Sequence, residues 1–259
     1  MIDAGLDAHQ RAVMERVIGE EEAKRRHLVI ALSGAHAYGF PSPDSDLDLK
    51  AIHVESTTKL LGLAPATPTS DRMEVIEGVE IDYTSNELKP VLIGVLTGNG
   101  NYLERILGPL LLHQSPDLTS LQPIARKTLS KRIYRHYLGF ATSQRRAYEG
   151  EGGGTAKKLL YVLRTTLTGA HALRTGEIVT DLRELCDDYG FPEARELIEA
   201  KRAGERTVLS PELRAAWSTR MDRAFTALDD AHANSKLPLD PEGEAELEAW
   251  LLDIRTRAR

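Results

Sequence analysis

Several patterns that define other classes of protein are missing from this 259-residue sequence. Its single cysteine, Cys186, excludes an intrachain disulfide and is typical of a protein in a reducing cytosol. No cysteine and histidine residues have the spacing of a zinc site. No apolar run reaches the length of a membrane span, and residues 1–4 do not start a signal peptide. We therefore expect a cytoplasmic protein that makes no contact with a membrane.

The charge of the chain is unevenly distributed. Charged residues make up 28% and apolar residues 41%, which is ordinary for a soluble globule of one large or two modest domains. Between Leu121 and Thr175 there are 11 Lys+Arg and 2 Asp+Glu, or +9, which leaves 22 against 37, or −15, elsewhere. This basic segment predicts either a site for a polyanion, such as a triphosphate or nucleic acid, or solvated helix faces. Both interpretations stay open for Lys131, Arg132, Arg145 and Arg146.

The most informative segment is a turn of small residues followed by two closely spaced acids. Residues 33–40 are SGAHAYGF and residues 44–50 are DSDLDLK. The apolar residues 28–32 predict a strand that leads into the turn, and Leu47, Leu49 and Ile52 predict a second strand after it. The sequence therefore brings a glycine-containing turn and an acidic strand together within about two dozen residues.

Asp46 and Asp48 are two residues apart, so their carboxylates share one face of the strand, about 7 Å apart. They repel each other unless a cation lies between them, and Mg²⁺ is a hard ion that takes one or two carboxylates plus phosphate oxygens. Backbone N–H groups of the turn at Gly34 would form an anion-binding nest. The alternative is a solvated loop after Pro43, because Asp-Ser-Asp is also typical of turns.

These motifs resemble the DNA-polymerase-β-type nucleotidyltransferase superfamily, whose signature is a strand, a Gly-Ser turn, a short helix and then D-x-D on the next strand. The form found from Gly34 to Gly39 and from Ser45 to Asp48 is similar to one bacterial and phage branch, the RNA-repair nucleotidyltransferases found near RNA ligases. The resemblance covers roughly residues 27–206. Its weaker segments are residues 99–104, 115–116, 136–137, 157–164 and 199–205.

The resemblance implies an enzyme that moves a nucleoside monophosphate from an NTP to a hydroxyl, with release of pyrophosphate. It implies two Mg²⁺ ions, for which Mn²⁺ can substitute, and an RNA end as acceptor, such as tRNA or a broken RNA. Asp46 and Asp48 would be catalytic metal ligands together with a third acid on a neighbouring strand. Glu80 and Asp82 share one face of the strand predicted at residues 78–83, and the resemblance favours Asp82, the alternative being a solvated sheet face.

The turn departs from the family pattern at one position. The family usually has serine after the glycine, and this chain has Ala35, with Ser33 on the other side of Gly34. The backbone donors survive this change, whereas one hydroxyl donor is lost unless Ser33 replaces it. The resemblance implies that nucleotide-binding residues include Ser33, Gly34, Ala35 and Ser45.

A second group of candidate nucleotide ligands lies on a helix predicted over residues 155–174. Lys157, Tyr161 and Arg164 form one stripe, with Lys158 beside it. Lysine supplies a compact charge, arginine a bidentate fork and tyrosine an aromatic face, which suits a triphosphate and a base. The alternative is an exposed stripe beside a core. Packing is the commoner role for the other polar and aromatic residues near the motifs, which are His36, Tyr38, His136 and Tyr137.

The fold class that follows is α+β, with a small mixed β-sheet nucleotidyltransferase core and flanking helices in residues 1–113, and an all-helical domain in residues 114–259. Strands are predicted near residues 28–32, 47–54 and 79–83, after a helix over residues 7–25, with a loop around Pro65 and Pro68 between the second and third strands. Further helices are predicted over residues 117–129, 131–148, 155–174, 181–189, 193–203, 211–233 and 242–257.

Two other functions are compatible with these residues. One is transfer of NMP or AMP onto a protein or a small molecule, as a toxin or a resistance enzyme would do. The other is a degenerate nucleotide- or RNA-binding module, which the alanine at position 35 motivates. The choice of NTP, the identity of the acceptor and the oligomeric state are not encoded in any motif.

Overall fold

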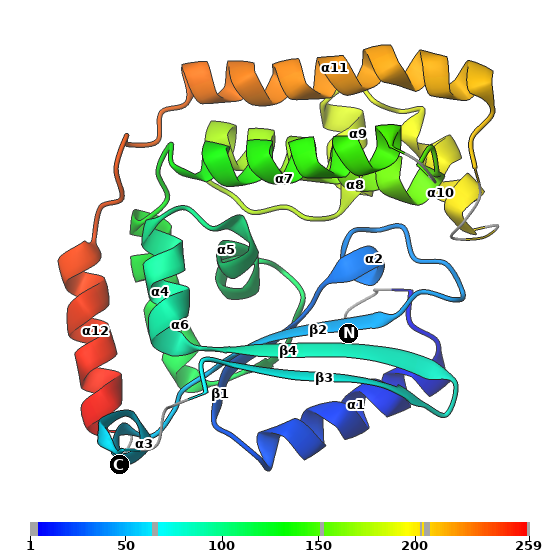
Figure 1. The fold of residues 1–259 in the computed structure, drawn as a ribbon. Helices are drawn as coiled ribbons and strands as arrows, with labels where there is room; N and C mark the ends of the chain where they lie inside the picture. Colours follow the sequence, from blue (N-terminus) through cyan, green and yellow to red (C-terminus); the bar gives the residue numbers. More distant parts are fainter. Residues whose placement is uncertain (1–4, 64–66, 151–152, 203, 205–207, 258–259) are drawn as a thin grey trace. The chain divides into compact units, whose positions relative to one another are not determined.

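The computed structural model describes residues 5–63, 67–150, 153–202, 204 and 208–257 (Figure 1). The chain is divided into two compact units. The first unit contains the chain up to Gly34, residues 46–129 and the chain from Asp240 onward. The second contains residues 35–45 and 130–239. Positions 203 and 205 of the weak motif at 199–205, Pro65 and residues 1–4 lie outside the described residues.

The first unit is built on a five-stranded mixed sheet in the order β3-β4-β2-β1-β5. Strand β2 runs parallel to β4, and the other three neighbouring pairs are antiparallel. The predicted mixed sheet of an α+β fold is confirmed. The strands are β1 His27–Leu32, β2 Leu47–His53, β3 Thr69–Ile76, β4 Val79–Glu87 and β5 Leu111–Gln114.

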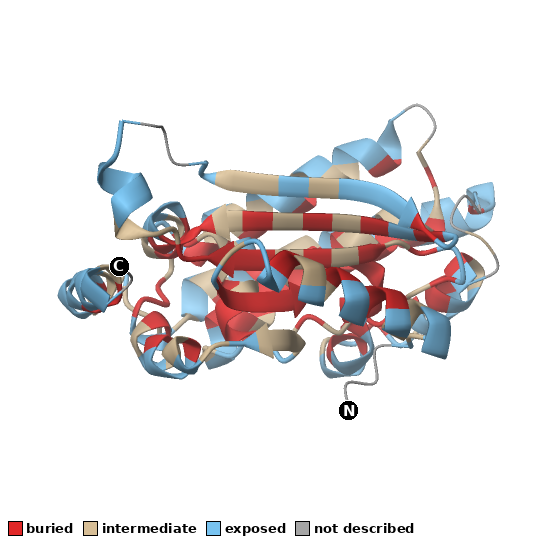
Figure 2. Cartoon of the chain, turned by 90° about the horizontal axis from the view of Figure 1, so that it is seen from below, coloured by how far each residue is buried: buried red, intermediate tan, exposed pale blue. Residues whose placement is uncertain are grey.

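The burial of each strand follows from its residue pattern. Strand β1, HLVIAL, lies between β2 and β5 and is buried along its whole length, whereas β4 alternates between buried and more exposed positions (Figure 2). Over residues 47–50 of β2 and 79–83 of β4, buried apolar residues alternate with less buried polar ones, so Asp48 and Asp82 lie on the face opposite to Leu47, Leu49 and Ile81. Near the acids, this face of the two strands therefore carries the polar side chains Asp48, Lys50 and Asp82.

Two of the strands were not predicted. Strand β3 lies in the stretch that the sequence assigned to a loop, because it is a mostly exposed edge strand whose Met73 and Val75 point outward. It pairs with β4 through a turn in which Glu77 and Gly78 both have positive φ, a geometry that favours a tight hairpin. Strand β5 is the other edge strand and has only four residues.

Helices cover both faces of the sheet in the first unit. Figure 1 shows α1 (Ala8–Glu22) on one face and α4 (Leu88–Leu96) and α5 (Gly100–Leu107) on the other. Helix α1 begins at a capping box formed by Asp7 and Gln10. The remaining helices of this unit are α3 (Thr57–Leu61), α6 (Pro116–Lys127) and α12 (Glu244–Arg257), and the short helix α2 (Gly34–Ala37) begins where the chain leaves it.

Helix α12 returns to the first unit although it ends the chain. It packs on α6 and α4, the indole Nε1 of Trp250 donates to Ser120 Oγ at 2.9 Å, and Lys127 pairs with Glu246 at 2.7 Å. The boundary between the two compact units therefore differs from the one predicted at residue 113, because residues 114–129 and the chain from Asp240 onward belong to the unit that contains the sheet.

The second unit is helical, as predicted. Helix α8 (Ala156–Thr175) is buried along most of its length and packs against four of the longer helices of this unit. Gly169 admits Tyr137 here, because an added Cβ would lie 2.6 Å from that ring. These four helices are α7 (Ile133–Glu149), α9 (Leu182–Asp188), α10 (Ala194–Arg202) and α11 (Pro211–Asn234). Among the described residues of both units, no helix is long and apolar enough to cross a bilayer.

Candidate active site

Two of the predicted acids face each other across neighbouring strands. Asp48 on β2 and Asp82 on β4 are register partners in the parallel pair, and both are half-buried. Their strand neighbours Leu47, Leu49 and Ile81 are fully buried on the opposite face. The alternation of β2 and β4 thus brings two carboxylates together on the polar face of the sheet, while Glu80, the other acid weighed for the third position, is exposed.

A lysine lies between the two carboxylates. The Lys50 Nζ is 2.8 Å from Asp82 Oδ1 and 3.7 Å from Asp48 Oδ1, and it also donates to the backbone carbonyl of Asp82 at 3.4 Å. Lys50 follows Asp48 by two residues and so lies on the same face of β2. Lys50 was not among the predicted site residues, although its spacing is visible in the D-x-D-x-K pattern.

The glycine of the predicted turn lies against Asp48. The Ser33 N–H donates to the Asp48 carbonyl at 2.8 Å, and Gly34 has a φ of +64°. An added Cβ at Gly34 would lie 1.7 Å from Asp48 Oδ2, so only glycine allows the carboxylate to approach the turn this closely. The turn and the first strand acid are therefore one packed unit, with the carboxylate against the bare Cα.

The donor set of the acid pair suits a cation. Carboxylate oxygens are the ligands that Mg²⁺ prefers, and the pair already holds one positive charge, the Lys50 ammonium. Asp46 is half-buried and precedes β2 by one residue. Over the part of the chain that the structure describes, no group of three or more histidine, cysteine, aspartate or glutamate side chains is gathered so that it could hold a metal. Asp46, Asp48 and Asp82 as a set of three metal ligands stay a prediction.

Within the second unit, Ser45 is part of a buried hydroxyl pair. The Ser42 N–H donates to Ser45 Oγ at 3.0 Å, and the two hydroxyls are 3.0 Å apart. The fully buried Lys201 of α10 donates from Nζ to Ser42 Oγ at 2.9 Å and to Ser45 Oγ at 3.1 Å. Lys201 therefore fixes the loop that ends one residue before Asp46.

The predicted stripe on α8 contacts the loop of its own unit. The Arg164 guanidinium lies 3.6 Å from the centre of the Tyr38 ring, and Arg164 is only 3% exposed. Tyr161 makes edge-to-face contacts with Tyr38 and Phe40. Lys157, at the start of the helix, is half-buried, as is Lys158. The structure thus groups this stripe with residues 38–40, and its role as a set of nucleotide ligands stays a prediction.

Other residues that the sequence singled out have packing or pairing roles. Tyr137 is fully buried, and His136 stacks on Phe140 and meets Tyr137 edge to face. Arg145 pairs with both Glu149 and Asp222 at 2.7 Å. For Arg145 these pairs favour a solvated helix face over a polyanion site.

A buried histidine, His27, lies on the face of the sheet opposite to the acids and was not predicted from the sequence. His27 Nε2 and the Tyr83 hydroxyl are hydrogen-bonded at 2.7 Å, and both residues are almost fully buried. Burial, followed by the charges of Arg25, His53 and His113, lowers the pKa of His27 to about 4. Burial likewise raises the pKa of the Tyr83 hydroxyl. Both His27 and Tyr83 are therefore uncharged at neutral pH.

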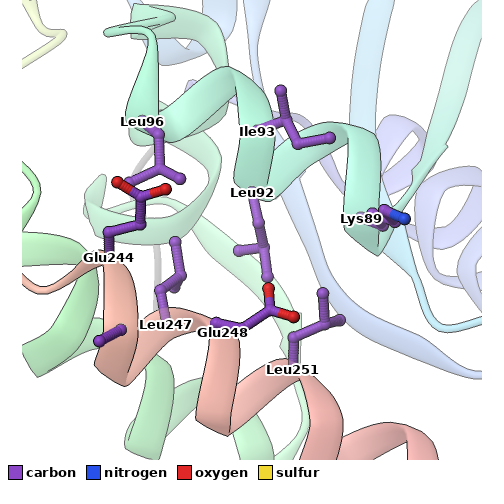
Figure 3. A pocket seen from close by; sticks show the side chains of 9 residues that line it. Lys89, Leu92, Ile93, Leu96, Glu244, Leu247, Glu248 and Leu251 are labelled. Carbon is purple, nitrogen blue, oxygen red and sulfur yellow. The ribbon is translucent and has the colours of Figure 1, made fainter.

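A groove of about 650 Å³ lies between α4 and α12 and not at the acids (Figure 3). Leu92 and Leu96 of α4 and Leu247 and Leu251 of α12 line it, together with the charged residues Lys89, Glu244 and Glu248. None of the predicted site residues lines it. Because this groove is separate from Asp48 and Asp82, it is no evidence for a nucleotide site at the acid pair.

Comparison with known proteins identifies the family. Residues 7–253 match the model of the RNA repair pathway DNA polymerase beta family, RlaP, and the chain belongs to that family. The predicted resemblance is thereby confirmed, and the membership supports nucleotidyl transfer as the general chemistry of this protein.

Two individual proteins are similar to this chain. An uncharacterized protein of Methanocaldococcus jannaschii is 27% identical over 230 residues, which are 86% of this chain and 91% of that protein. A crystal structure of a nucleotidyltransferase-like protein from Exiguobacterium sibiricum 255-15 aligns with 95% of this chain and 79% of its own, at 13% identity and a TM-score of 0.32. A TM-score this low does not establish a common fold.

Proposed function

We propose that this protein is a metal-dependent nucleotidyltransferase that moves a nucleoside monophosphate from an NTP to a hydroxyl, and that the hydroxyl belongs to an RNA end. The observation that carries the proposal is the acid pair: Asp48 and Asp82 are in register on parallel strands, share one cation, and lie beside the glycine turn that precedes them. Membership in a family of RNA-repair polymerase-β-like proteins supports the RNA acceptor.

In the proposed reaction the acceptor oxygen forms a bond to the α-phosphorus, the bond from the α-phosphorus to the oxygen that bridges it to the β-phosphorus breaks, pyrophosphate leaves, and the hydroxyl proton passes to water. Asp46, Asp48 and Asp82 would hold two Mg²⁺ ions, for which Mn²⁺ can substitute. When bound, such ions neutralise the charge of the triphosphate and lower the pKa of the attacking hydroxyl. Gly34 keeps the Asp48 carboxylate against the turn, because no side chain lies between them.

The remaining assignments to the nucleotide are proposals as well. Backbone N–H groups at Gly34 and Ala35 would hold the β- and γ-phosphates, with Ser33 and Ser45 as hydroxyl donors. Lys157, Lys158, Tyr161 and Arg164 would bind the triphosphate and the base. Ala35 is 2% exposed and contributes no hydroxyl, so the backbone has to carry the contact there. A cytoplasmic location is part of the proposal, supported by the single, buried cysteine.

The proposal is tested by following the α-phosphate. The protein is incubated with Mg²⁺, one α-³²P-labelled NTP at a time, and tRNA or cleaved RNA, and the label is then separated into RNA, protein and small molecules. We expect label in RNA together with an equal amount of pyrophosphate. The double variant Asp46→Ala, Asp48→Ala should lose both products, whereas Glu80→Gln, an exposed acid on the same strand as Asp82, should keep them.

The alternatives give different results. Label in a protein or a small molecule, abolished by the double variant, would replace the RNA acceptor but retain the chemistry. Thermal stabilisation by NTP with no pyrophosphate release would indicate a binding module without turnover. Label transferred equally by the wild-type protein and the double variant would contradict the proposed site.

A further inference from the structure

The ammonium of Lys50 occupies the position at the acid pair where a cation is needed. It lies within 3.7 Å of one oxygen from each of Asp48 and Asp82, and the Lys50 side chain is only 18% exposed. Its second contact with Asp82, to the backbone carbonyl, fixes the amine against β4 as well as against the carboxylate. These contacts join the two strands at the level of the acids.

The charges explain why a lysine is useful at this position. Two carboxylates in register on neighbouring strands repel each other in a partly desolvated site, and one ammonium between them removes most of that repulsion. A divalent cation satisfies the same oxygens with twice the charge. An ammonium and a metal ion at the same oxygens repel each other, so the Lys50 charge opposes the binding of a metal ion there.

We propose that Lys50 is an internal counter-ion of the active site: it holds Asp48 and Asp82 in the ligand-free protein, and a divalent cation has to displace it in order to bind. The inference rests on the proposed function, which supplies the divalent cation. Lys50 is thus a positioning residue, since it acts through the carboxylates of Asp48 and Asp82.

The test is direct Mn²⁺ binding in the absence of nucleotide, measured as free Mn²⁺ by electron paramagnetic resonance at low ionic strength. Lys50→Met keeps the length of the stem and removes the charge. We expect it to bind Mn²⁺ about tenfold more tightly than the wild-type protein, because no positive charge has to be displaced. Lys50→Arg keeps the charge and should resemble the wild-type protein. Should Lys50→Met fail to fold, Lys50→Gln provides the same comparison.

Lys59→Met is the matched control, because Lys59 also pairs with a carboxylate, that of Glu55, but is 68% exposed and lies on α3. Its Mn²⁺ affinity should equal that of the wild-type protein. If Lys50→Met binds Mn²⁺ no more tightly than the wild-type protein, while Asp48→Asn abolishes binding, the counter-ion role is refuted and the metal site stands. If neither the wild-type protein nor Lys50→Met binds Mn²⁺, the proposed metal site fails and the counter-ion role fails with it.

Discussion

Replacement of Gly34 by alanine is expected to disable the site while leaving the fold intact. Gly34 has a φ of +64°, which an L-residue adopts at a cost of about 1–2 kcal/mol. The new Cβ would also lie 1.7 Å from Asp48 Oδ2, closer than the 3.0 Å that Cβ contacts in proteins keep, so the carboxylate has to move by more than 1 Å.

The two effects can be separated because the chain contains a second glycine with the same backbone requirement. Gly78, in the turn between β3 and β4, has a φ of +86° and nothing within 4 Å of an added Cβ. Gly78→Ala should therefore cost only the backbone strain, about 1–2 kcal/mol. Gly34→Ala should cost about 2–4 kcal/mol, because displacement of Asp48 also loosens its pairing with Lys50.

Urea denaturation measures both costs, and pyrophosphate release measures the functional effect. A misplacement of about 1 Å in a catalytic group can reduce a rate about 100-fold, and that is the loss we expect for Gly34→Ala. Gly78→Ala should keep wild-type activity. Equal activities for the two variants, or a Gly34→Ala protein no less stable than Gly78→Ala, would refute the close packing of Asp48 on the turn.

Three further predictions follow from the site and its surroundings. The pKa of His27 is about 4 in the folded protein and 6.5 in the unfolded chain, so its contribution to stability is complete above pH 6.5 and is lost as the pH falls toward 4. Urea denaturation should show a free energy of unfolding about 2 kcal/mol lower at pH 5 than at pH 7, and His27→Gln should remove this difference. If the variant keeps the same pH dependence of the free energy of unfolding, other groups are responsible for the loss. Lys201→Met should lower the free energy of unfolding by about 1–3 kcal/mol, because the buried Ser42 and Ser45 hydroxyls lose a hydrogen-bond donor. An unchanged urea midpoint would show that Lys201 does not stabilise this loop. Lys157→Gln should raise the KM for NTP about tenfold with kcat unchanged if Lys157 binds the triphosphate, and an unchanged KM would remove it from the site.

The local part of the site was predictable from the sequence. Alternation with a period of two predicted that Asp48 lies on one face of β2 and Asp82 on one face of β4, and the burial of Leu47, Leu49 and Ile81 on the other face agrees, whereas Asp46 lies just before β2. The same rule applied two residues further along β2 would have found Lys50. It was missed because lysine on a half-buried strand face is usually a solvated residue.

The non-local part was not predictable. Asp48 lies opposite Asp82 because β2 pairs with β4, two strands between which β3 lies along the chain. No local sequence pattern encodes this pairing or its register. Strand β3 itself was missed because an edge strand carries exposed and charged residues in place of an apolar core pattern. The contact of Arg164 with Tyr38 likewise depends on how α8 packs on a distant loop.

Pyrophosphate release by single asparagine variants tests the central claim most directly. Asp48→Asn and Asp82→Asn each remove one negative charge from the pair and keep the shape of the side chain. With Mg²⁺, all four NTPs and an RNA acceptor, both variants should fall at least about 100-fold below the wild-type protein, whereas Glu80→Gln should match it. Wild-type rates in Asp48→Asn and Asp82→Asn would contradict a catalytic role for the acid pair.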